Sequence, residues 1–234
     1  SNAYTADVDD VKKVDRVFEK EKPDAVFYLA GPMHLRRPLS DPLFAKDIGF
    51  LSRITNVLEA CKKHRVKKIV LVSSGGAIYE NTTALPAGET DAVSPGSLYG
   101  LANLLTEKYA AQYYQQYDMR FTIARLSNVY GPRQWRSGFI PAVLTNMLKG
   151  EGPIIFGTGR QVRDFIYVDD LVEALILLSE KGRNDVYNVA SGQGVSLKKT
   201  FDLMQKLLGS KVRPVYQSAT LSGIKKSVLD IKKI

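Results

Sequence analysis

The sequence is nearly free of cysteine: its 234 residues include one, Cys61. A single thiol excludes a disulfide within the chain and is typical of a protein kept in a reducing compartment, so we expect a cytoplasmic location. Long hydrophobic runs are missing as well. A helix that crosses a bilayer needs about 20 consecutive apolar residues. The best candidate, Leu171 to Leu178, is short and contains Glu173, so we expect no membrane partner.

Acidic residues are fewer than basic ones, because the sequence has 24 Asp and Glu but 33 Lys and Arg, which gives a net charge of +9. Part of the excess lies in 62–68, where a helix is expected to end and cations complement its dipole. The sequence lacks any recognisable nucleic-acid-binding motif. We therefore interpret the charge as a solvated face that also suits anionic nucleotide substrates, and expect no nucleic acid partner.

The first half of the chain alternates short, apolar, β-branched runs with amphipathic segments, which predicts an α/β fold with a parallel sheet and right-handed crossovers. The expected strands are 25–30, 69–73 and 121–125, and the expected helices are 10–21, 43–63 and 98–117. The strand at 25–30 is expected to be buried.

The regular alternation of predicted strands and helices ends at Gly131–Pro132. Beyond it we expect helices at 140–149, after Asp169–Asp170 as caps, and from the Ser196 cap to Leu208. Strands are expected at 153–156, 165–168 and 186–189, with a basic strand and the start of one more helix in 212–234.

The most informative stretch joins the strand 69–73 to the helix that opens at Tyr99. The strand ends in Ser73–Ser74–Gly75–Gly76, and Tyr99 precedes the helically spaced Leu101, Leu105 and Tyr109. Ligands of open α/β sheets lie beyond the carboxyl ends of the strands, so the serines and the phenol are expected to border one crevice. The alternative is a polar turn and a tyrosine that only opens a helix.

Several segments, in order along almost the whole chain, resemble the extended short-chain dehydrogenases/reductases, in the NAD-dependent nucleotide-sugar epimerase/dehydratase group. They are Ala6–Asp7–Val8, Val26-Phe-Tyr-Leu-Ala-Gly31, Val72-Ser-Ser-Gly-Gly-Ala-Ile-Tyr79, Ser94-Pro-Gly-Ser-Leu-Tyr-Gly100, Arg125-Leu-Ser-Asn-Val-Tyr-Gly-Pro-Arg133, Gly157-Thr-Gly-Arg-Gln-Val-Arg-Asp-Phe-Ile-Tyr-Val-Asp-Asp170 and Tyr187-Asn-Val-Ala-Ser-Gly192. Any one of them alone would be weak, whereas the ordered set is specific.

The resemblance implies a Rossmann-like, doubly wound parallel sheet with a small C-terminal substrate lobe. Residues 1–3 look like a remnant of tag removal. Residues 4–131 would form a partial NAD-binding domain, to which 161–192 return, while 132–160 and 193–234 would form the substrate lobe. The resemblance also implies a homodimer in which the helices 43–63 and 98–117 of the two copies pack together.

The resemblance further assigns roles to single residues, with NAD as cofactor, a nucleotide sugar (a UDP-sugar) as substrate and no metal ligands. The implied catalytic residues are Tyr99, as proton shuttle, and Ser74, the nearest hydroxyl. The implied cofactor-binding residues are Asp7 and Val8 at the adenine, Leu29, Ala30 and Gly31 along the dinucleotide, and Ser73 and Asn103. Asn128 would touch the sugar or its diphosphate and Arg163 would grip phosphate. Alternatively, Asn128 is a loop-stabilising amide, and Arg163 forms an ion pair with Asp164 or Asp169.

Three departures from the family pattern weaken the case for full activity. The Gly-rich turn that binds pyrophosphate, and the strands around it, do not precede Tyr4, so we expect a truncated chain in which the strand 25–30 is a long apolar edge. Asn103 stands where the family has a lysine whose ammonium would favour the phenolate of Tyr99. Gly75 stands where the family usually has a hydroxyl. A degenerate, non-catalytic relative that binds nucleotide sugar or a protein partner is therefore the second hypothesis.

The turn after the strand 69–73 also separates reaction types within the family. Dehydratases and sugar-acid decarboxylases commonly carry acidic residues there, whereas this chain has Gly76 and Ala77. The resemblance therefore favours a 4-epimerase-like activity over dehydration.

Overall fold

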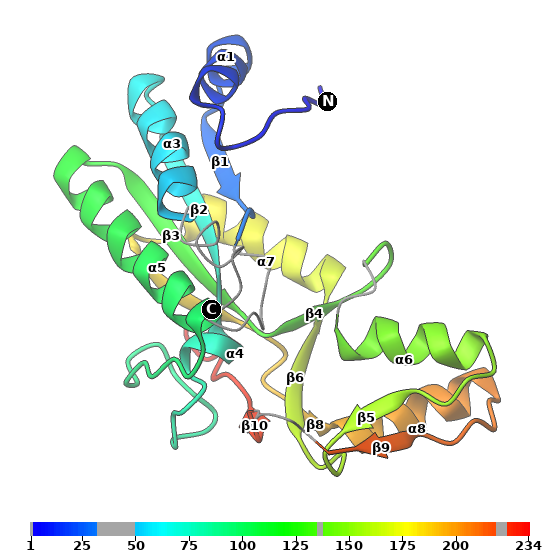
Figure 1. Ribbon diagram of the computed structural model, residues 1–234. Coiled ribbons are helices and arrows are strands. Elements are labelled where there is room, and N and C mark those ends of the chain that lie inside the picture. The colour runs from blue at the N-terminus through cyan, green and yellow to red at the C-terminus, as the bar shows by residue number, and fades with distance from the viewer. Residues whose placement is uncertain (1, 32–49, 135–137, 219–223) are drawn as a thin grey trace.

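The computed structural model describes residues 2–31, 50–134, 138–218 and 224–234. At its centre lies a parallel sheet in the order β1-β2-β3-β7 (Figure 1). Its strands are β1 (Ala25–Tyr28), β2 (Lys68–Ser74), β3 (Arg120–Leu126) and β7 (Asp185–Val189). The α/β fold predicted from the alternating pattern is confirmed.

Helices cover both faces of this sheet, which makes it doubly wound. On one face lie α1 (Val11–Glu21), α3 (Phe50–Lys63) and α5 (Leu98–Tyr117), and on the other lies α7 (Val168–Lys181). Alternate residues of a strand point to opposite faces. Accordingly Leu71 of β2 joins the core under α3 and α5, while its neighbour Val70 joins the core under α7.

The predicted strand 25–30 is shorter than expected and forms the apolar edge predicted for it. In the described residues β1 pairs with β2 alone, so it forms an edge of the sheet. Phe27 is 40% exposed, and Leu29, just beyond the strand, is 61% exposed. The apolar run predicted burial on both faces, but burial depends on what packs beside the strand.

The helix 98–117 is confirmed at both ends, but its inward face differs from the one that its leucines suggest. Leu101, Leu105 and Tyr109 are all exposed, whereas Asn103 and Glu107 are buried against the sheet. The predicted helix 43–63 is observed from Phe50, and its part 43–49 lies outside the described residues.

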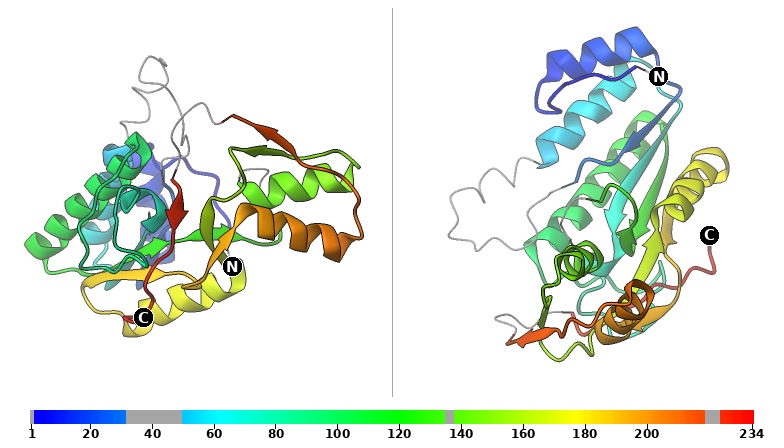
Figure 2. Two further views of the ribbon diagram at one scale, coloured as in Figure 1. Left: turned by 90° about the horizontal axis from the view of Figure 1, so that it is seen from below. Right: turned by 90° about the vertical axis from the view of Figure 1, so that its right-hand side faces the viewer.

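A second group of elements stands beside the main sheet (Figure 2). It contains α6 (Phe139–Leu148), β5 (Ile154–Phe156), α8 (Leu197–Leu208) and β9 (Val215–Gln217), with β5 and β9 paired in parallel. Val143, Met147, Ile155 and Phe201 form its core. Ser196 caps α8 as predicted, because its hydroxyl accepts a hydrogen bond from Lys199 N.

The two groups are joined by β4 (Asn128–Tyr130), β6 (Val162–Tyr167), β8 (Gly194–Ser196) and β10 (Lys226–Ser227), which form one sheet around β6. The central strand of this sheet, β6, begins at Val162 and so earlier than the predicted strand 165–168. Asp169 and Asp170 lie in the first turn of α7 rather than at its cap, which is Tyr167. In the described part of 212–234 we find β9 and β10 but not the expected helix.

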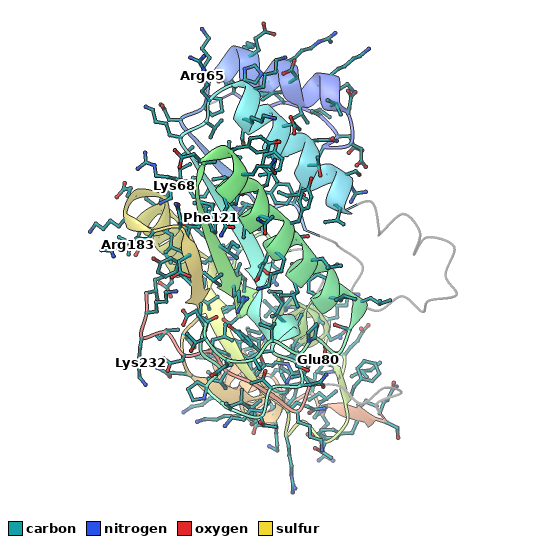
Figure 3. All side chains as sticks on the ribbon, turned by 90° about the vertical axis from the view of Figure 1, so that its left-hand side faces the viewer. Arg65, Lys68, Glu80, Phe121, Arg183 and Lys232 are labelled. Atoms are coloured by element: carbon teal, nitrogen blue, oxygen red, sulfur yellow. The ribbon has the colours of Figure 1, made fainter. Side chains whose placement is uncertain are left out.

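Lys68 explains how the end of α7 is held against the sheet. Its side chain is buried, and its ammonium donates to the carbonyl oxygens of Leu178 and Gly182 at 2.7 and 2.6 Å. Figure 3 shows Lys68 beside this helix end. Burial, and the nearby Arg120, lower the pKa of Lys68.

Among the described residues no helix has the length and apolarity to span a bilayer.

Candidate functional site

The carboxyl ends of the parallel strands bring the predicted residues toward one edge of the sheet. Leu29 to Gly31 follow β1, Ser73 and Ser74 end β2, and Ser127 follows β3. Because β1, β2 and β3 are parallel and adjacent, these segments are neighbours at that edge. This is where an open α/β sheet holds its ligand.

Two hydroxyl groups at this edge are buried and lack hydrogen-bond partners among the described residues. They belong to Ser73 and Ser127. A buried polar atom without a partner costs about 1–3 kcal/mol, so native structures rarely leave it unpaired without a reason. Unpaired hydroxyls at the strand ends fit a polar ligand that completes their hydrogen bonding.

Tyr99 lies in the first turn of α5, and that turn packs against the short helix that follows β2. The helix is capped by Ser97, whose hydroxyl accepts a hydrogen bond from Gly100 N at 3.2 Å. The chain after Ser74 forms a short helix, α4 (Gly75–Ile78), where the sequence predicted only a turn. Gly100 sits so close to α4 that a Cβ on it would lie 2.5 Å from the carbonyl oxygen of Ala77. Tyr99 itself is half-buried, so packing does not seal its side chain.

Asn103 turns its amide toward its own helix. Its side-chain nitrogen donates to the carbonyl oxygen of Tyr99 at 2.8 Å, and the residue is buried. The geometry therefore ties Asn103 to the backbone of the turn that carries Tyr99.

Gly75 lies under the C-terminal segment of the chain. A Cβ at this position would come within 2.7 Å of a methyl group of Leu229, which is itself fully buried. Backbone hydrogen bonds from Ala87 N to Val228 O and from Asp230 N to Ala87 O hold that segment in place. A larger residue at 75 would have to displace Leu229.

Asp7 and Val8 lie beside the beginning of α3. The carbonyl oxygen of Val8 accepts a hydrogen bond from the side chain of Asn56 at 2.9 Å, and Asp9 forms an ion pair with Arg53 at 3.1 Å. A helix between parallel strands runs back from their carboxyl ends, so its first turns stand near that edge. Asp7 and Val8 therefore lie toward the same edge as the serines.

The segment Leu29, Ala30 and Gly31 is exposed. Among the residues that the structure describes, no atom outside the neighbouring residues lies within 4 Å of the position that a Cβ would take on Gly31. This open stretch, beside the buried Ser73, leaves room for an extended ligand to run along the end of β1.

Asn128 and Arg163 come from the sheet around β6. The side-chain nitrogen of Asn128 donates to the carbonyl oxygen of Asp164 at 3.1 Å, which links β4 to β6. The Arg163 guanidinium donates to the carbonyl oxygen of Val162 at 2.8 Å. The Asp164 carboxylate instead accepts hydrogen bonds from Ser191 and Gly192, and side chains adjacent on a strand point to opposite faces.

Sequence reasoning missed two buried polar groups near the site. One is Asp164, which joins β6 to the loop after β7. The other consists of Arg125, Glu107 and Tyr79 between β3, α5 and α4. Helical spacing was the available signal for Glu107, which stands one turn beyond Asn103 on the same face.

Metal chemistry finds little support in the part of the chain that the structure describes. There, no group of three or more His, Cys, Asp and Glu side chains is arranged to hold a metal ion.

Comparisons with known proteins point to one family. A family model described as "NAD dependent epimerase/dehydratase family" matches residues 2–190. A putative UDP-glucose 4-epimerase of Methanocaldococcus jannaschii is 35% identical over 231 residues, covering 97% of this chain and 75% of the relative.

Solved structures are similar over nearly the whole chain. The UDP-glucose 4-epimerase of Thermotoga maritima, crystallised with UDP-glucose, has a TM-score of 0.92 at 36% identity, covering 98% of this chain and 75% of the other. A UDP-glucose 4-epimerase of Thermus thermophilus in complex with NAD has a TM-score of 0.88 at 30% identity, covering 97% and 76%.

Proposed function

Because this chain belongs to the NAD-dependent epimerase/dehydratase family, we propose that it binds NAD and a uridine diphosphate sugar and inverts the sugar at carbon 4. The similar proteins whose names specify UDP-glucose 4-epimerases support this choice within the family. The absence of acidic residues in α4 also favours epimerisation over dehydration.

The residues at the carboxyl edge fit NAD. The unpaired hydroxyl of Ser73 and the open stretch at Leu29, Ala30 and Gly31 suit a long, polar ligand lying across the ends of β1 and β2. Asp7 and Val8 would hold its adenine end. When bound, this cofactor supplies a hydride acceptor and donor, which the side chains of a protein do not offer.

The chain's own residues would move the proton and orient the sugar. The phenol of Tyr99 would take the proton of the sugar hydroxyl and return it, as general base and then general acid. Ser74, at the end of β2, would donate a hydrogen bond to the same oxygen. Arg163 would hold the diphosphate with the paired donors of its guanidinium, and Asn128 would use its remaining amide oxygen on the sugar.

One observation carries this proposal: the turn that bears Tyr99 rests on α4, directly after the two serines that end β2. General acid–base catalysis requires the proton acceptor within hydrogen-bond reach of the substrate. Because α4 follows Ser74 without a break, this contact brings the turn that bears Tyr99 to the same end of the sheet as the two serines.

Three broader expectations belong to this proposal. Residues 4–131 with 161–192 form the NAD-binding part, while 132–160 and 193–234 form the substrate lobe. The exposed apolar row Leu101, Leu105 and Tyr109 on α5, next to α3, supports a homodimer through these helices. The cytoplasmic location stays a prediction.

The second candidate is a relative that binds nucleotide sugar without turnover. It is favoured by Asn103, which brings no charge to Tyr99, and by the contact of Leu229 over Gly75. Both observations concern catalysis rather than binding, so the two candidates differ in turnover alone.

The decisive experiment incubates the full-length natural protein with UDP-glucose and NAD and measures UDP-galactose by chromatography. We expect interconversion that Tyr99→Phe abolishes and that Tyr117→Phe, at the far end of α5, leaves unchanged. Calorimetry with UDP completes the test, because binding without any interconversion supports the second candidate. Equal turnover in Tyr99→Phe and the parent chain would refute the proposed role of Tyr99.

A further inference from the structure

A buried ionic cluster lies directly beneath the candidate site. Arg125 of β3 and Glu107 of α5 are 4% and 2% exposed. The Nε and terminal nitrogens of Arg125 donate to the Glu107 carboxylate at 3.0 and 2.7 Å, which is a two-pronged contact. The other terminal nitrogen donates to the Tyr79 hydroxyl at 2.5 Å.

Each member of this cluster belongs to a different element that borders the site. Arg125 is the direct cross-strand neighbour of Ser73 in the β2–β3 register. Glu107 lies on the buried face of α5, two turns beyond Tyr99. Tyr79 ends α4, and its N–H donates to the Gly75 carbonyl oxygen at 3.0 Å. One guanidinium therefore connects the strand beside Ser73 with both helices that flank it.

The chemistry of the cluster suits the orientation of its partner elements better than the stabilisation of the fold. Taking an ion pair out of water costs several kcal/mol per ion, and an apolar cluster of similar volume often stabilises a fold as well or better. A planar guanidinium with directed donors, by contrast, fixes the angle between its partners. Burial raises the pKa of Tyr79 against the effect of Arg125, so its hydroxyl stays neutral and keeps accepting this hydrogen bond.

We propose, on the basis of the function proposed above, that Arg125, Glu107 and Tyr79 are positioning residues that set the separation between the Tyr99 phenol and the Ser73 and Ser74 hydroxyls. The first turn of α5 contacts α4 through Gly100, so a tilt of either helix changes that separation. The hydrogen bonds described for Asn128 and Arg163, the residues proposed to hold the substrate, go to Asp164 and Val162 in the sheet around β6. Loss of the cluster should therefore slow the reaction while leaving substrate affinity nearly intact.

The sharpest test compares two substitutions that each remove one buried tyrosine hydroxyl. Tyr79→Phe removes the hydroxyl that Arg125 contacts. Tyr114→Phe is the matched control, because the buried hydroxyl of Tyr114 on α5 has no hydrogen-bond partner among the described residues. Glu107→Gln is the stronger variant, and Tyr79→Phe keeps the proposal testable if that variant does not fold.

Two measurements are made on each variant. We expect Tyr79→Phe to lower kcat about tenfold with KM for the UDP-sugar within about twofold, since small misplacements of reacting groups carry costs of this size. We expect amide hydrogen exchange to become about tenfold faster in 75–79 and 98–105 and to stay unchanged in α8, as local loosening predicts. Tyr114→Phe should change neither.

The outcomes separate the positioning role from the proposed function. If the parent chain shows no interconversion, the proposed function fails, and the exchange pattern alone decides whether the cluster positions α4 and α5. Exchange that rises equally throughout the molecule, or that does not change near the site, overturns the positioning role. A parallel change of kcat and KM, or an unchanged kcat in an active protein, overturns it as well.

Discussion

At the scale of single residues, Asn103 and Gly100 shape the surroundings of Tyr99. Asn103 binds the carbonyl oxygen of the turn that carries Tyr99, and Gly100 lets this turn approach α4. Neither brings a charge to the site. Asn103 therefore secures the backbone of the turn, and Gly100 determines how closely the turn approaches α4.

Placing an ammonium at position 103 should increase activity. In Asn103→Lys the positive charge lies one helical turn from Tyr99 and favours the phenolate. We expect kcat at neutral pH to rise about tenfold, a gain typical of a better-matched general base, and the rising part of the pH profile to move to lower pH. The measurement is kcat against pH. Asn103→Ala removes the same hydrogen bond without adding charge, so equal rates in both variants would contradict the prediction.

Gly100→Ala tests the contact between α5 and α4. In an ordinary helix this change stabilises by about 1 kcal/mol. Here the new carbon would lie 2.5 Å from the Ala77 carbonyl oxygen and 2.9 Å from the Cβ of Pro95. We therefore expect a loss of about 1–3 kcal/mol in the free energy of unfolding, measured with urea. Gln116→Ala, on the exposed side of α5, should change it by less than about 0.5 kcal/mol. A stabilised Gly100→Ala variant would show that the contact is looser than described.

At the scale of elements, the junction between α1 and α3 depends on one carboxylate. Asp15 of α1 lies 2.7 Å from the Lys63 ammonium and 2.8 Å from Nε2 of His64, at the end of α3. The hydrogen bond from Lys63, and then that from His64, hold the pKa of Asp15 below its ordinary value of 3.8. The junction should therefore weaken in acid.

The sign of this pH dependence follows from the lowered pKa. A carboxyl group that is more acidic in the folded state stabilises the fold above its unfolded pKa, and this contribution disappears as pH falls through the folded pKa. Asp15→Asn should thus lower Tm at neutral pH, with a difference that shrinks as pH falls below 3.8. Thermal melts from neutral pH to about pH 2 measure it. Glu19→Gln, on the exposed side of α1, is the control, and a pH-independent difference would argue against the ionic origin.

At the scale of the whole molecule, the described sheet ends at β1, which exposes apolar side chains to solvent. An unpaired strand edge offers N–H and C=O groups to another chain, and exposed apolar residues strengthen that attraction. Phe27, on this strand, is 40% exposed. The edge is therefore the place where we expect unspecific association to begin.

Phe27→Lys should reduce this association, because a charge on an edge strand opposes pairing with a second strand. The measurement is light scattering against protein concentration, with less scattering expected for the variant. Leu207→Lys is the matched control, since Leu207 is more exposed but lies on α8, away from any strand edge. Equal improvement by both substitutions would assign the effect to net charge instead of the edge.

Much of the fold was predictable from the sequence because local patterns determine it. Apolar β-branched runs, helical spacing and the Ser196 cap depend on near neighbours along the chain, and they predicted the strands β2, β3 and β7, the helix α5 and the start of α8. The ordered motifs also predicted the family and its cofactor, which the comparisons confirm.

Other features depend on residues far apart in the sequence, so the tertiary structure alone decided them. The inward face of α5 depends on the partner that Glu107 finds in Arg125. The contact of Leu229 with Gly75 likewise joins distant parts of the chain. Local sequence determines which elements form, whereas packing between distant elements determines which side chains are buried, paired or open to a ligand.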